Sequence, residues 1–591
     1  MHQLIITPEK KLSSPRTIFW LALSLFFSIL YGLLVLQQAF DGEYVVQDDA
    51  RKHIFWMRRW LNPELFQQDL ISDFFQSIQP IGLKAVYGGF AQLGVDPMLT
   101  NRCFPLLIGM VMSIYCFCIC FELFPLPIAG FITTLLLNQS FWMRDTITAA
   151  VASSFAYPLF FGFLYYWLNQ SYSLCLLFLT LEGLFYPPVT LLSLGLLVID
   201  FIWDCLGKSA NTKADLTNLK SWFYIMGLGI TVVLLLGYQF SASDYGPVIR
   251  GFEARNLPEF QIGGRAEFYS PNLIRFRLLG TRSGMVPRGL FSPITLCSGL
   301  LFPIFIFCRR KLLLLYQTKI LEFLIKLLTV SITLFLIAHQ ALFHLFLPSR
   351  YTSYSFYLII AITSGITITS MIDQFFQRGI NQLSKLSQAL PSRLQTVNVA
   401  IFQSLFCFSS IIVITAALIL YPITLDKFTA PNYVRPREFF LYEHLAQYPK
   451  DTLIASLSEE ADNIPTFAQL PILVGWEYAL PYQTQYYQQI RERSLALIQA
   501  QYSSNPNVLK DFINRYQVDL FLVDLDAFTP EFFTRNDWFR QRHDIAARIQ
   551  PNANQSALLK LADRCAVYQS SRFVVIQSKC VVEQLEKKYF Q

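Results

Sequence analysis

The stretch TIFWLALSLFFSILYGLLVLQ, residues 17–37, carries no charged side chain and is long enough to cross a membrane as one helix. It decides the fold class, because only a membrane or a large core can bury a helix that is apolar on all sides. The stretch VVQDDARKHIFWMRRW, residues 45–60, follows closely and places two acids, Asp48 and Asp49, directly before a basic cluster. These charges stand where the chain is expected to leave the membrane for the first time.

The composition is that of a membrane protein with many helices. Of the 591 residues, 53% are hydrophobic and 16% aromatic, and the mean hydropathy is +0.39. Only 15% are charged, against about 25% in soluble domains, which excludes an ordinary soluble enzyme. The formal charge of +7 does not indicate nucleic acid as a partner, because the placement of charges matters more than their sum in a membrane protein.

Apolar runs predict a transmembrane domain over residues 1–422 with about eleven helices. A spanning helix needs about 20 mostly apolar residues. Basic residues precede the first run, which is too long for a signal peptide, so we expect a retained first helix. The predicted spans lie near 17–37, 104–122, 125–140, 146–168, 172–183, 185–203, 222–240, 291–308, 324–347, 354–372 and 400–421.

Basic residues also predict the orientation of these helices. With the N-terminus in the cytoplasm, loops 204–221, 308–319 and 373–399 face inward, and all three are basic, as the positive-inside rule requires. A large first loop, 38–103, and a second long loop, 241–290, then face outward, together with everything after residue 422. The two long loops and the C-terminal tail are therefore expected on one face of the membrane.

The tail, residues 430–591, is predicted to be a soluble extracytoplasmic α/β domain. Short apolar runs alternate with helical patterns, which is typical of α/β domains. The predicted strands are TLIASL (452–457), PILVGWEY (471–478) and VDLFLVD (518–524), and the predicted helices cover 486–502 and 506–516.

The eleven cysteines give no metal signature. Cys116, Cys118 and Cys120 lie inside an apolar run, where we expect them to pack as small hydrophobic side chains. Cys565 and Cys580 are the only pair in the tail, and they are expected to form a disulfide if the tail faces an oxidising compartment.

The two acids of the first loop are candidates for catalysis. Either one can cap a helix that starts there, and Asp49 would then face His53 one turn later, as Asp48 would face Lys52. A solvated interfacial helix whose basic residues touch lipid headgroups explains the same pattern. The functional alternative is a general base, or an electrostatic partner for an acceptor hydroxyl, at the membrane surface.

The second long loop is rich in arginine. It contains seven Arg and no Lys, and arginine binds phosphate oxygens in pairs through its planar fork. Contacts with headgroups or with the glutamates of the same loop explain some of these residues. The choice of arginine over lysine favours a phosphate or pyrophosphate site near the outer interface. The residues are Arg250, Arg255, Arg265, Arg275, Arg277, Arg282 and Arg288.

Other candidates stand in short outward segments. HLFLPSRYTSY, residues 344–354, places Arg350 at a helix end, where a buried cation is costly unless an anion pairs with it. His339 and His344 are expected to be hydrogen-bonded core histidines, with His344 near the proposed site. The loop FWMRDT adds Arg144 and Asp145 to the same face.

The tail also contains VDLDAF, with Asp524 and Asp526 spaced like the metal-binding acids of soluble nucleotide-sugar transferases. We expect instead an acid pair ahead of a helix, because nucleotide sugars are cytoplasmic and the tail is predicted outside. The sequence contains no Walker A, G-x-G-x-x-G, H-E-x-x-H or G-x-S-x-G motif, so ATP-driven transport, dinucleotide chemistry and the commoner hydrolases lack support.

Taken with these features, the chain resembles the GT-C superfamily, integral-membrane glycosyltransferases that use polyprenyl-phosphate-linked sugars. QDDARKHIFWMRRWLNPELFQQDLISDFF is similar to the acid-bearing first loop of bacterial members. LPSRYTSY and the tail segment DTLIASLSEEADNIPTFAQLPILVGWEYALPY are also similar to them. The resemblance covers nearly the whole chain and implies a GT-C-like polytopic α-helical membrane protein in the bacterial inner (cytoplasmic) membrane.

The resemblance also implies roles for single residues. The catalytic acid of the first loop corresponds to Asp48 or Asp49, with Asp48 favoured and Asp49 as a capping or metal partner. Asp145 corresponds to a second-loop acid, but it lacks a D-x-D, so a divalent cation (Mg or Mn) is only a candidate cofactor. The expected substrate-binding residues are Arg51, His53, Arg144, Asp145, Arg275, Arg277, Arg282, His344, Arg350 and Tyr351.

The mechanism implied is transfer of a sugar from the lipid carrier to an acceptor hydroxyl on the outer face. Arginines stabilise the departing phosphate while a carboxylate takes the hydroxyl proton. The expected partners are the polyprenyl-phosphate-linked donor, a glycan, lipid or protein acceptor, and membrane lipids. The alternatives are a transporter or flippase of a lipid-linked or anionic solute, a polysaccharide ligase or polymerase, and a non-catalytic scaffold.

Overall fold

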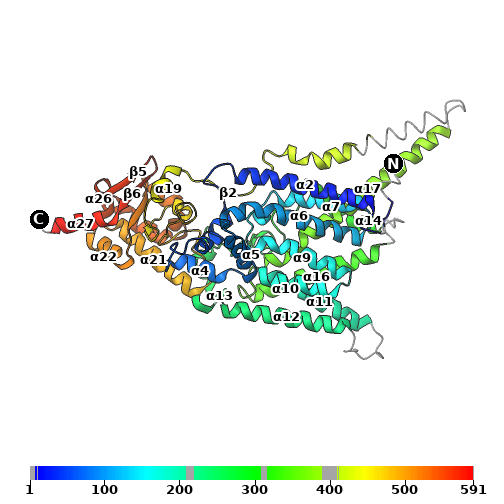
Figure 1. Cartoon of the computed structure of the whole chain (residues 1–591), viewed down its shortest axis with the longest axis horizontal. Helices are drawn as coiled ribbons and strands as arrows, with labels where there is room; N and C mark the ends of the chain where they lie inside the picture. Colours follow the sequence, from blue (N-terminus) through cyan, green and yellow to red (C-terminus); the bar gives the residue numbers. More distant parts are fainter. Residues whose placement is uncertain are drawn as a thin grey trace.

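The computed structural model describes residues 7–9, 11–207, 219–241, 243–307, 316–388, 409 and 412–589. Long helices lie side by side in a helical body, and the C-terminal region forms a separate layer at one end of it (Figure 1). Much of the predicted span 400–421 lies outside the described residues. So do the basic residues Lys10, Lys208, Lys213, Arg309, Arg310, Lys311 and Arg393.

Apolar helices make up the helical body. They are α2 (Pro15–Ala39), α6 (Pro97–Leu123), α7 (Pro127–Phe141), α9 (Ala152–Leu168), α10 (Tyr172–Phe185), α11 (Pro187–Gly207), α12 (Leu219–Ser241), α14 (Phe302–Phe307), α16 (Gln317–Gln340) and α17 (Ser349–Gln388). Six of the helices in the described ranges, α2, α6, α11, α12, α16 and α17, are long and apolar enough to cross a membrane. The chain is thus a helical membrane protein, and the number of eleven spans stays a prediction.

Local sequence sets where these helices begin. Ser14 accepts a hydrogen bond from the Thr17 backbone N–H at 3.2 Å, directly before Pro15 at the first turn of α2. Asp96 does the same for Met98 at 2.9 Å, directly before Pro97 in α6. Such side chains satisfy N–H groups that have no partner within the helix, and proline fits the first turn because it has no N–H to lose.

Tight packing around Trp142 holds the start of the helical body to the candidate site. A Cβ atom on Gly109 of α6 would lie 2.6 Å from Trp142 Cζ2, and one on Gly32 of α2 would lie 3.4 Å from Trp142 Cη2. The indole N–H donates to Asn138 of α7 at 3.0 Å. Since Trp142 ends α7, this contact fixes the following Arg144–Asp145 turn against the first two long helices.

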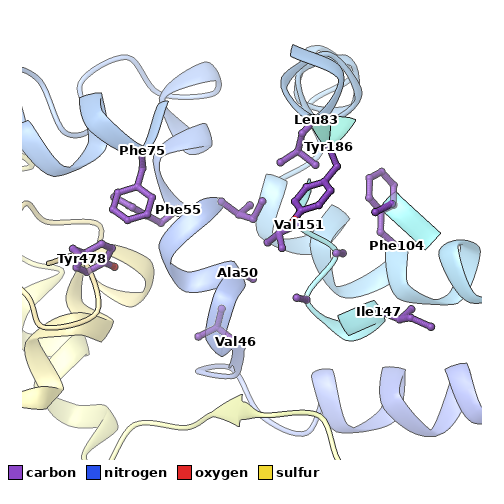
Figure 2. Packing of buried hydrophobic residues seen from close by; sticks show 14 of the residues in the cluster. Val46, Ala50, Phe55, Phe75, Leu83, Phe104, Ile147, Val151, Tyr186 and Tyr478 are labelled. Carbon is purple, nitrogen blue, oxygen red and sulfur yellow. The ribbon is translucent and has the colours of Figure 1, made fainter. Parts of the chain in front are cut away.

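The first long loop folds against the C-terminal region. It contains α3 (Asp48–His53), a 3-10 turn (Phe55–Trp60), α4 (Leu70–Ile78) and α5 (Ile81–Gln92). Phe55 and Phe75 pack edge-on against Tyr478 of the tail, with ring centroids 5.5 and 5.6 Å apart (Figure 2). Burying these rings removes apolar surface from water, which favours docking of the two segments.

Further contacts bring the predicted outward segments to the same end. β1 (Val46–Gln47) pairs with β2 (Tyr433–Val434) in antiparallel register, and Val248 of the 241–290 loop bridges to Gln483. The backbone N–H of Ser349 donates to Arg282 O at 3.3 Å. The expectation that these segments meet is confirmed, while the side of the membrane that they face stays a prediction.

The C-terminal region contains a four-stranded mixed sheet in the order β3-β4-β6-β5. β3 (Ile454–Ala455) runs parallel to β4 (Leu520–Asp524), and both β6 (Phe573–Gln577) and β5 (Ala566–Gln569) are antiparallel to their neighbours. The surrounding helices are α19 (Phe439–Leu445), α20 (Ile464–Phe467), α21 (Thr484–Tyr502), α22 (Pro506–Tyr516), α23 (Pro530–Arg535), α24 (Asp537–Gln541), α25 (His543–Ile549), α26 (Ala557–Cys565) and α27 (Ser578–Tyr589).

The predicted elements of the tail are partly correct. The helices at 486–502 and 506–516 and the strand at 518–524 are confirmed by α21, α22 and β4. The predicted strand at 471–478 is wrong: only Ile472 makes an isolated bridge, and the chain then turns, with Tyr478 N–H donating to Gly475 O. The segment still exchanges two hydrogen bonds with Ile454 of β3, through Pro471 and Leu473, before Tyr478 packs on the first loop. Cys565 and Cys580 form the expected disulfide.

Candidate active site

The two acids of the first loop open the short helix α3, but neither one caps it. The cap is Gln47, whose side-chain oxygen accepts from the N–H groups of Asp49 at 2.7 Å and Ala50 at 3.1 Å. The expected aspartate cap is therefore wrong, because the extended backbone of Gln47 brings its amide over these N–H groups first. Both carboxylates keep their oxygens for other contacts, and both lie at the helix end that favours negative charge.

The carboxylate of Asp48 forms ion pairs with basic residues of its own helix. Arg51 Nη2 lies 2.7 Å from Asp48 Oδ1, and Lys52 Nζ lies 3.9 Å from Asp48 Oδ2. The side chain of Asp48 is 24% exposed. The expected contact between Asp48 and Lys52 is thus confirmed, and the shortest contact of this carboxylate is with a guanidinium.

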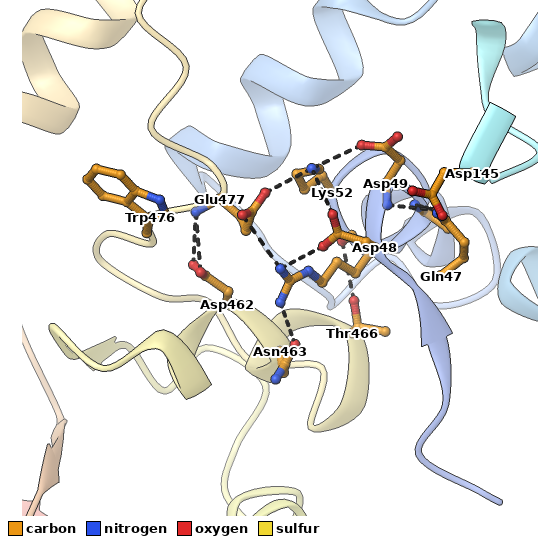
Figure 3. A network of polar contacts seen from close by, with 12 residues as sticks. Gln47, Asp48, Asp49, Lys52, Asp145, Asp462, Asn463, Thr466, Trp476 and Glu477 are labelled. Carbon is orange, nitrogen blue, oxygen red and sulfur yellow. Dashed lines mark hydrogen bonds and ion pairs between the residues drawn. The ribbon is translucent and has the colours of Figure 1, made fainter. Parts of the chain in front are cut away.

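Arg51 and Lys52 connect the first loop to the tail through hydrogen bonds. Figure 3 shows Lys52 beside Glu477. Arg51 Nη1 donates to Asn463 Oδ1 at 2.8 Å, across 412 residues of sequence, and Lys52 Nζ donates to Glu477 Oε2 at 2.8 Å. The hydroxyls of Thr466 and Tyr478 both donate to the backbone oxygen of Arg51. Arg51, expected to bind substrate, is buried and holds two parts of the chain together.

Glu477 is the anion at the centre of this network. Arg265 Nη2 donates to Glu477 Oε2 at 2.8 Å, and Lys52 donates to the same oxygen. Burial raises the pKa of Glu477, but the charges of Lys52, Arg265 and Arg51 outweigh it and bring the pKa to about 2. Glu477 therefore remains charged at physiological pH and compensates cations from two segments.

Asp462 lies behind Glu477 in the tail (Figure 3). Its two carboxylate oxygens each lie 3.3 Å from the backbone nitrogen of Glu477. Burial raises the pKa of Asp462 to about 7, although the Arg51 charge opposes the shift. This carboxyl group therefore changes charge near neutral pH within the network.

Asp49 faces the other way. Its side chain is 45% exposed, and Lys52 Nζ lies 3.0 Å from Asp49 Oδ1. Burial raises the pKa of Asp49, but the charges of Lys52, His53 and Arg350 outweigh it and bring the pKa to about 2. Asp49 is thus ionised at physiological pH and has an accessible face, and it lies close enough to Arg350 for their charges to interact.

Asp145 joins the same end of the molecule. Asp145 Oδ1 accepts from the Asn432 backbone N–H at 2.7 Å and from Gln47 Nε2 at 3.3 Å. Burial raises the pKa of Asp145, and the charges of Asp49 and Asp48 add to the shift. The second-loop acid and the first-loop acids are therefore neighbours, as the resemblance implied, and Gln47 links them.

Arg350 differs from Arg51 and Arg265 because no carboxylate of the described residues forms an ion pair with it. Its Nε atom is buried and has no hydrogen-bond partner, as is also true of the Arg51 Nε atom. The guanidinium of Arg350 interacts electrostatically with the hydroxyl groups of Tyr157, Tyr186 and Tyr354, and with the carboxylate of Asp49. The rings of Tyr157 and Tyr186 lie 4.7 and 5.6 Å from the ring of Tyr354. An arginine held among phenol groups in this way is suited to an external anion.

Arg282 lies next to Arg350 and Arg265. Burial lowers the pKa of Arg282, and the charges of Arg265 and Arg350 lower it further. Its Nη1 donates to Glu267 O, a neutral carbonyl, at 3.2 Å. Arg275, in contrast, is 59% exposed and pairs with Glu267, and Arg277 packs on the ring of Phe276.

Several other predicted binding residues are occupied by internal contacts. Arg144 donates to the backbone oxygens of Arg288 and Gly289 and lies over the ring of Tyr357. The hydroxyl of Tyr351 donates to Leu345 O at 2.8 Å.

His53 does not supply a cation to the site. Its Nδ1 atom contacts Gln79 Nε2 at 2.6 Å, and burial lowers the pKa of His53 to about 4, so the ring is neutral at physiological pH. The expectation that His344 is a core histidine is wrong, because its side chain is exposed in a turn after α16. His339, expected to be a core histidine, contacts Ser283 O at 2.9 Å.

Sequence reasoning missed Glu477, Asp462 and the tyrosines around Arg350. Glu477 stands in GWEY, which was quoted as part of a strand and not as a source of charge. The tyrosines belong to α9, the end of α10 and α17, so nothing in their spacing indicates that they meet. Tyr186 directly before the Pro187-Pro188 break was the one local signal, because breaks in apolar helices often line functional cavities.

The carboxylates of Asp48, Asp49 and Asp145 lie at one end of the molecule, where they are candidate ligands for a metal ion. Within the described ranges no group of three or more His, Cys, Asp or Glu side chains is placed to hold an ion. Asp48 and Asp49 are paired with cations, and Asp145 accepts hydrogen bonds from two donors. The donor set seen here does not by itself form a divalent-cation site.

Comparisons with known proteins support the fold. A scan against protein-family models and a comparison with curated protein sequences both gave no match. Among solved structures, the oligosaccharyltransferase of Archaeoglobus fulgidus tethered to an acceptor peptide is similar at TM-score 0.50 and 12% identity, covering 94% of this chain and 72% of that one.

The same enzyme in two other states is similar to this chain as well. Its complex with an inhibitory peptide and a dolichol-phosphate gives TM-score 0.50 and 11% identity, covering 94% and 73% of the two chains. Its apo form gives 0.51 and 11%, covering 91% and 73%. The chain therefore shares its fold with this archaeal membrane enzyme.

Proposed function

We propose that this chain is a GT-C-type membrane glycosyltransferase. It moves a sugar from a polyprenyl-phosphate carrier to an acceptor hydroxyl on the outer face of the bacterial inner membrane. Support comes from the shared fold, since the archaeal enzyme has been solved with a dolichol-phosphate and with an acceptor peptide. The observation that carries the proposal is Arg350, whose guanidinium has a buried Nε, forms no ion pair with a carboxylate of the described residues and lies close enough to Asp49 for their charges to interact.

Arg350 and Arg282 hold the carrier phosphate in this proposal. Each repels the other in the absence of an anion, and a phosphate between them would remove that repulsion and gain charge-assisted hydrogen bonds. As the bond from the sugar to the phosphate breaks, the negative charge on the leaving phosphate grows, and fixed cations stabilise it.

Asp49 acts on the acceptor. We favour it over Asp48 because it is more exposed and because the Asp48 carboxylate lies against Arg51. The acceptor oxygen attacks the anomeric carbon, the bond between that carbon and the phosphate oxygen breaks, and the hydroxyl proton passes to Asp49. The attack comes from the side opposite the leaving phosphate, which inverts the anomeric centre.

The ion network of Arg51, Lys52, Arg265 and Glu477 positions Asp49. Lys52 pairs with both Asp49 and Glu477, so Glu477 of the tail orients the Asp49 carboxylate through this one lysine. A transporter would not need a carboxylate positioned in this way beside a phosphate site, and the fold favours the transferase over that alternative.

A divalent cation, Mg or Mn, stays a candidate cofactor. The carboxylates of the described residues do not by themselves form a site for such an ion, so no step of the transfer is assigned to it. The transfer described above uses only residues of this chain. Treatment with EDTA, followed by addition of Mg or Mn, tests whether an ion is required.

The proposal is tested by transfer with purified full-length protein in lipid nanodiscs. A panel of undecaprenyl-phosphate monosaccharides is supplied with lipid and glycan extracts as acceptors, and released undecaprenyl phosphate is measured by mass spectrometry. We expect release with at least one donor from wild-type protein and none from Asp49→Asn. Equal release from both proteins would contradict the assignment of Asp49, and movement of intact donor across the bilayer without release would favour a flippase.

The outward position of the tail is tested through its disulfide. Cysteines 565 and 580 should resist maleimide labelling in whole cells until a reductant is added. Labelling without a reductant would place the tail in the cytoplasm.

A further inference from the structure

A second group of charges lies at the end of the helical body away from the first-loop acids. It lines a cavity of about 300 Å³ between the end of α9 and the adjacent ends of α11, α12 and α16. α9 starts beside the Arg144–Asp145 turn and runs away from it, so its last residues reach the opposite end (Figure 1). A cavity of this size accommodates a small ligand or a headgroup.

Six charged side chains line this cavity, three of each sign. Lys326 Nζ lies 2.7 Å from Asp200 Oδ1 and 2.5 Å from Glu322 Oε1, and Lys220 Nζ lies 2.5 Å from Asp204 Oδ2. The Tyr224 hydroxyl donates to Asp200 at 2.9 Å, so two acids of α11 are tied to the start of α12. The charged set is Asp200, Asp204, Lys220, Lys319, Glu322 and Lys326.

Their position within apolar helices makes these charges costly. Asp200, Lys220 and Lys326 all belong to helices that are long and apolar enough to cross a membrane. The side chain of Lys326 is only 5% exposed. Ionisable residues in such segments are rare and mark functional sites by default, because apolar side chains would be cheaper there. If these helices span the membrane as predicted, the ends that carry the charges reach the level of the lipid headgroups.

We propose that this cavity binds the headgroup of a zwitterionic phospholipid, with a phosphate and a primary ammonium as in phosphoethanolamine. Each lysine of the cavity is paired with a carboxylate, Lys319 with Glu122 of α6 at 2.5 Å. A ligand that carries both charges can replace such an ion pair with two of its own, whereas a ligand of one charge leaves a partner uncompensated. Lysines bind phosphate as point charges, and the carboxylates accept hydrogen bonds from the ammonium. Trp167, Tyr172 and Phe223 also line the cavity, and aromatic rings attract ammonium groups.

Ligands of a single charge fit less well. An anionic headgroup would meet the three carboxylates, and a bare cation would meet the three lysines, each with repulsion at short range. A quaternary ammonium, as in phosphocholine, has no N–H to donate. The cavity should therefore prefer phosphatidylethanolamine to both phosphatidylglycerol and phosphatidylcholine.

The test is native mass spectrometry of the full-length protein with equal amounts of these three lipids, all with the same acyl chains. We expect phosphatidylethanolamine to be retained roughly tenfold better than either competitor, the ratio expected for one charge-assisted hydrogen bond. Preference for phosphatidylglycerol, or equal retention of all three, would overturn the proposal. Soluble phosphoethanolamine at excess should displace the lipid, and binding of the soluble compound without any lipid preference would overturn the lipid assignment.

Variants locate the effect. Lys220→Gln combined with Asp204→Asn removes one ion pair without changing the net charge, and it should abolish the preference. Glu322→Gln is a second variant in case the double variant fails to fold. The matched control is Lys510→Gln with Glu586→Gln, an ion pair of the C-terminal region that should leave the preference intact. A preference that survives in both cavity variants would overturn the proposal. Asp49→Asn should keep it, because this site does not depend on the proposed transfer.

Discussion

The candidate active site has two sides that treat charge in opposite ways. On the paired side, formed by Asp48, Arg51, Lys52, Arg265 and Glu477, every charged group has an opposite charge within 4 Å. On the open side, formed by Arg282 and Arg350, the cations meet neutral carbonyl and phenol groups and each other. Asp49 belongs to both sides: it pairs with Lys52 of the paired side, and the charge of Arg350 of the open side helps to lower its pKa.

This difference separates charges that are paired within the fold from those that we propose bind a ligand. A buried cation that is paired with a carboxylate holds neighbouring segments in place, because removal of either partner leaves an uncompensated buried charge and lowers the stability of the fold. A cation without one needs an anion from outside to offset its burial. The predictions below test this division, beginning with the largest expected effect.

The largest effect is expected at the border of the two sides. Asp49→Asn should lower the rate of transfer by roughly 10²–10⁴-fold, the usual contribution of a general base, while binding of undecaprenyl phosphate is retained. Transfer is measured in nanodiscs and binding by native mass spectrometry. Asp73→Asn is the matched control, because Asp73 is an exposed carboxylate of the same loop that pairs with Arg59. If Asp48→Asn alone abolishes transfer, the roles of the two acids are reversed.

On the paired side, removing the central anion should affect stability. Glu477→Gln leaves Lys52 and Arg265 without their carboxylate, which should cost about 3 kcal/mol of unfolding free energy. Thermal unfolding in detergent measures this loss. Glu492→Gln, which breaks an exposed pair with Arg515, should change stability by less than about 1 kcal/mol. Equal effects of the two substitutions would remove the distinction between the sides.

On the open side, removing the cation should affect binding and leave the fold unchanged. Arg350→Gln should weaken binding of undecaprenyl phosphate by roughly 10–100-fold, the value of a hydrogen bond to a charged group. Its melting temperature should not fall, because no ion pair is lost. Arg275→Gln removes an exposed arginine of the same face and should leave binding unchanged. A fall in stability with unchanged binding would make Arg350 a structural residue.

The smallest effect is the pH dependence of the paired side. The pKa of Asp462 is raised to about 7 in the folded chain, so the folded state binds more protons than the unfolded state between about pH 4 and 7. Stability should therefore fall as pH rises through this window, by about 2 kcal/mol between pH 5.5 and 7.5. Asp462→Asn should remove this slope. An unchanged slope in the variant would assign the titration to another group.

The sequence was sufficient for the broad architecture and for half of the site. The long apolar helices and the place of Asp48, Asp49 and Arg350 at their ends follow from local patterns, since apolar runs and charge are properties of neighbouring residues. The orientation inferred from the basic loops stays a prediction. The resemblance to a known superfamily then supplied the expected chemistry. The resemblance also indicated Asp145 as a site residue, and in the structure Gln47 of the first loop donates a hydrogen bond to Asp145.

The partners of these residues could not be predicted, because they come from distant segments. Arg51 and Asn463 are 412 residues apart, and Glu477 reaches Lys52 only after the tail docks through Phe55, Phe75 and Tyr478. Without those contacts Arg51 and Arg350 look alike in the sequence. In the fold, Arg51 forms ion pairs with Asp48 and Glu477, whereas no ion pair joins Arg350 to a carboxylate of the described residues.

The central claim is that the carrier phosphate binds on the open side. The most direct measurement is a cryo-electron microscopy structure of the full-length chain in nanodiscs with undecaprenyl phosphate. We predict the phosphate within hydrogen-bond distance of Arg350 and next to Arg282, with Asp49 facing it and the contacts of Glu477 unchanged. A phosphate bound instead to Arg51 or Lys52, with Glu477 displaced, would contradict the account.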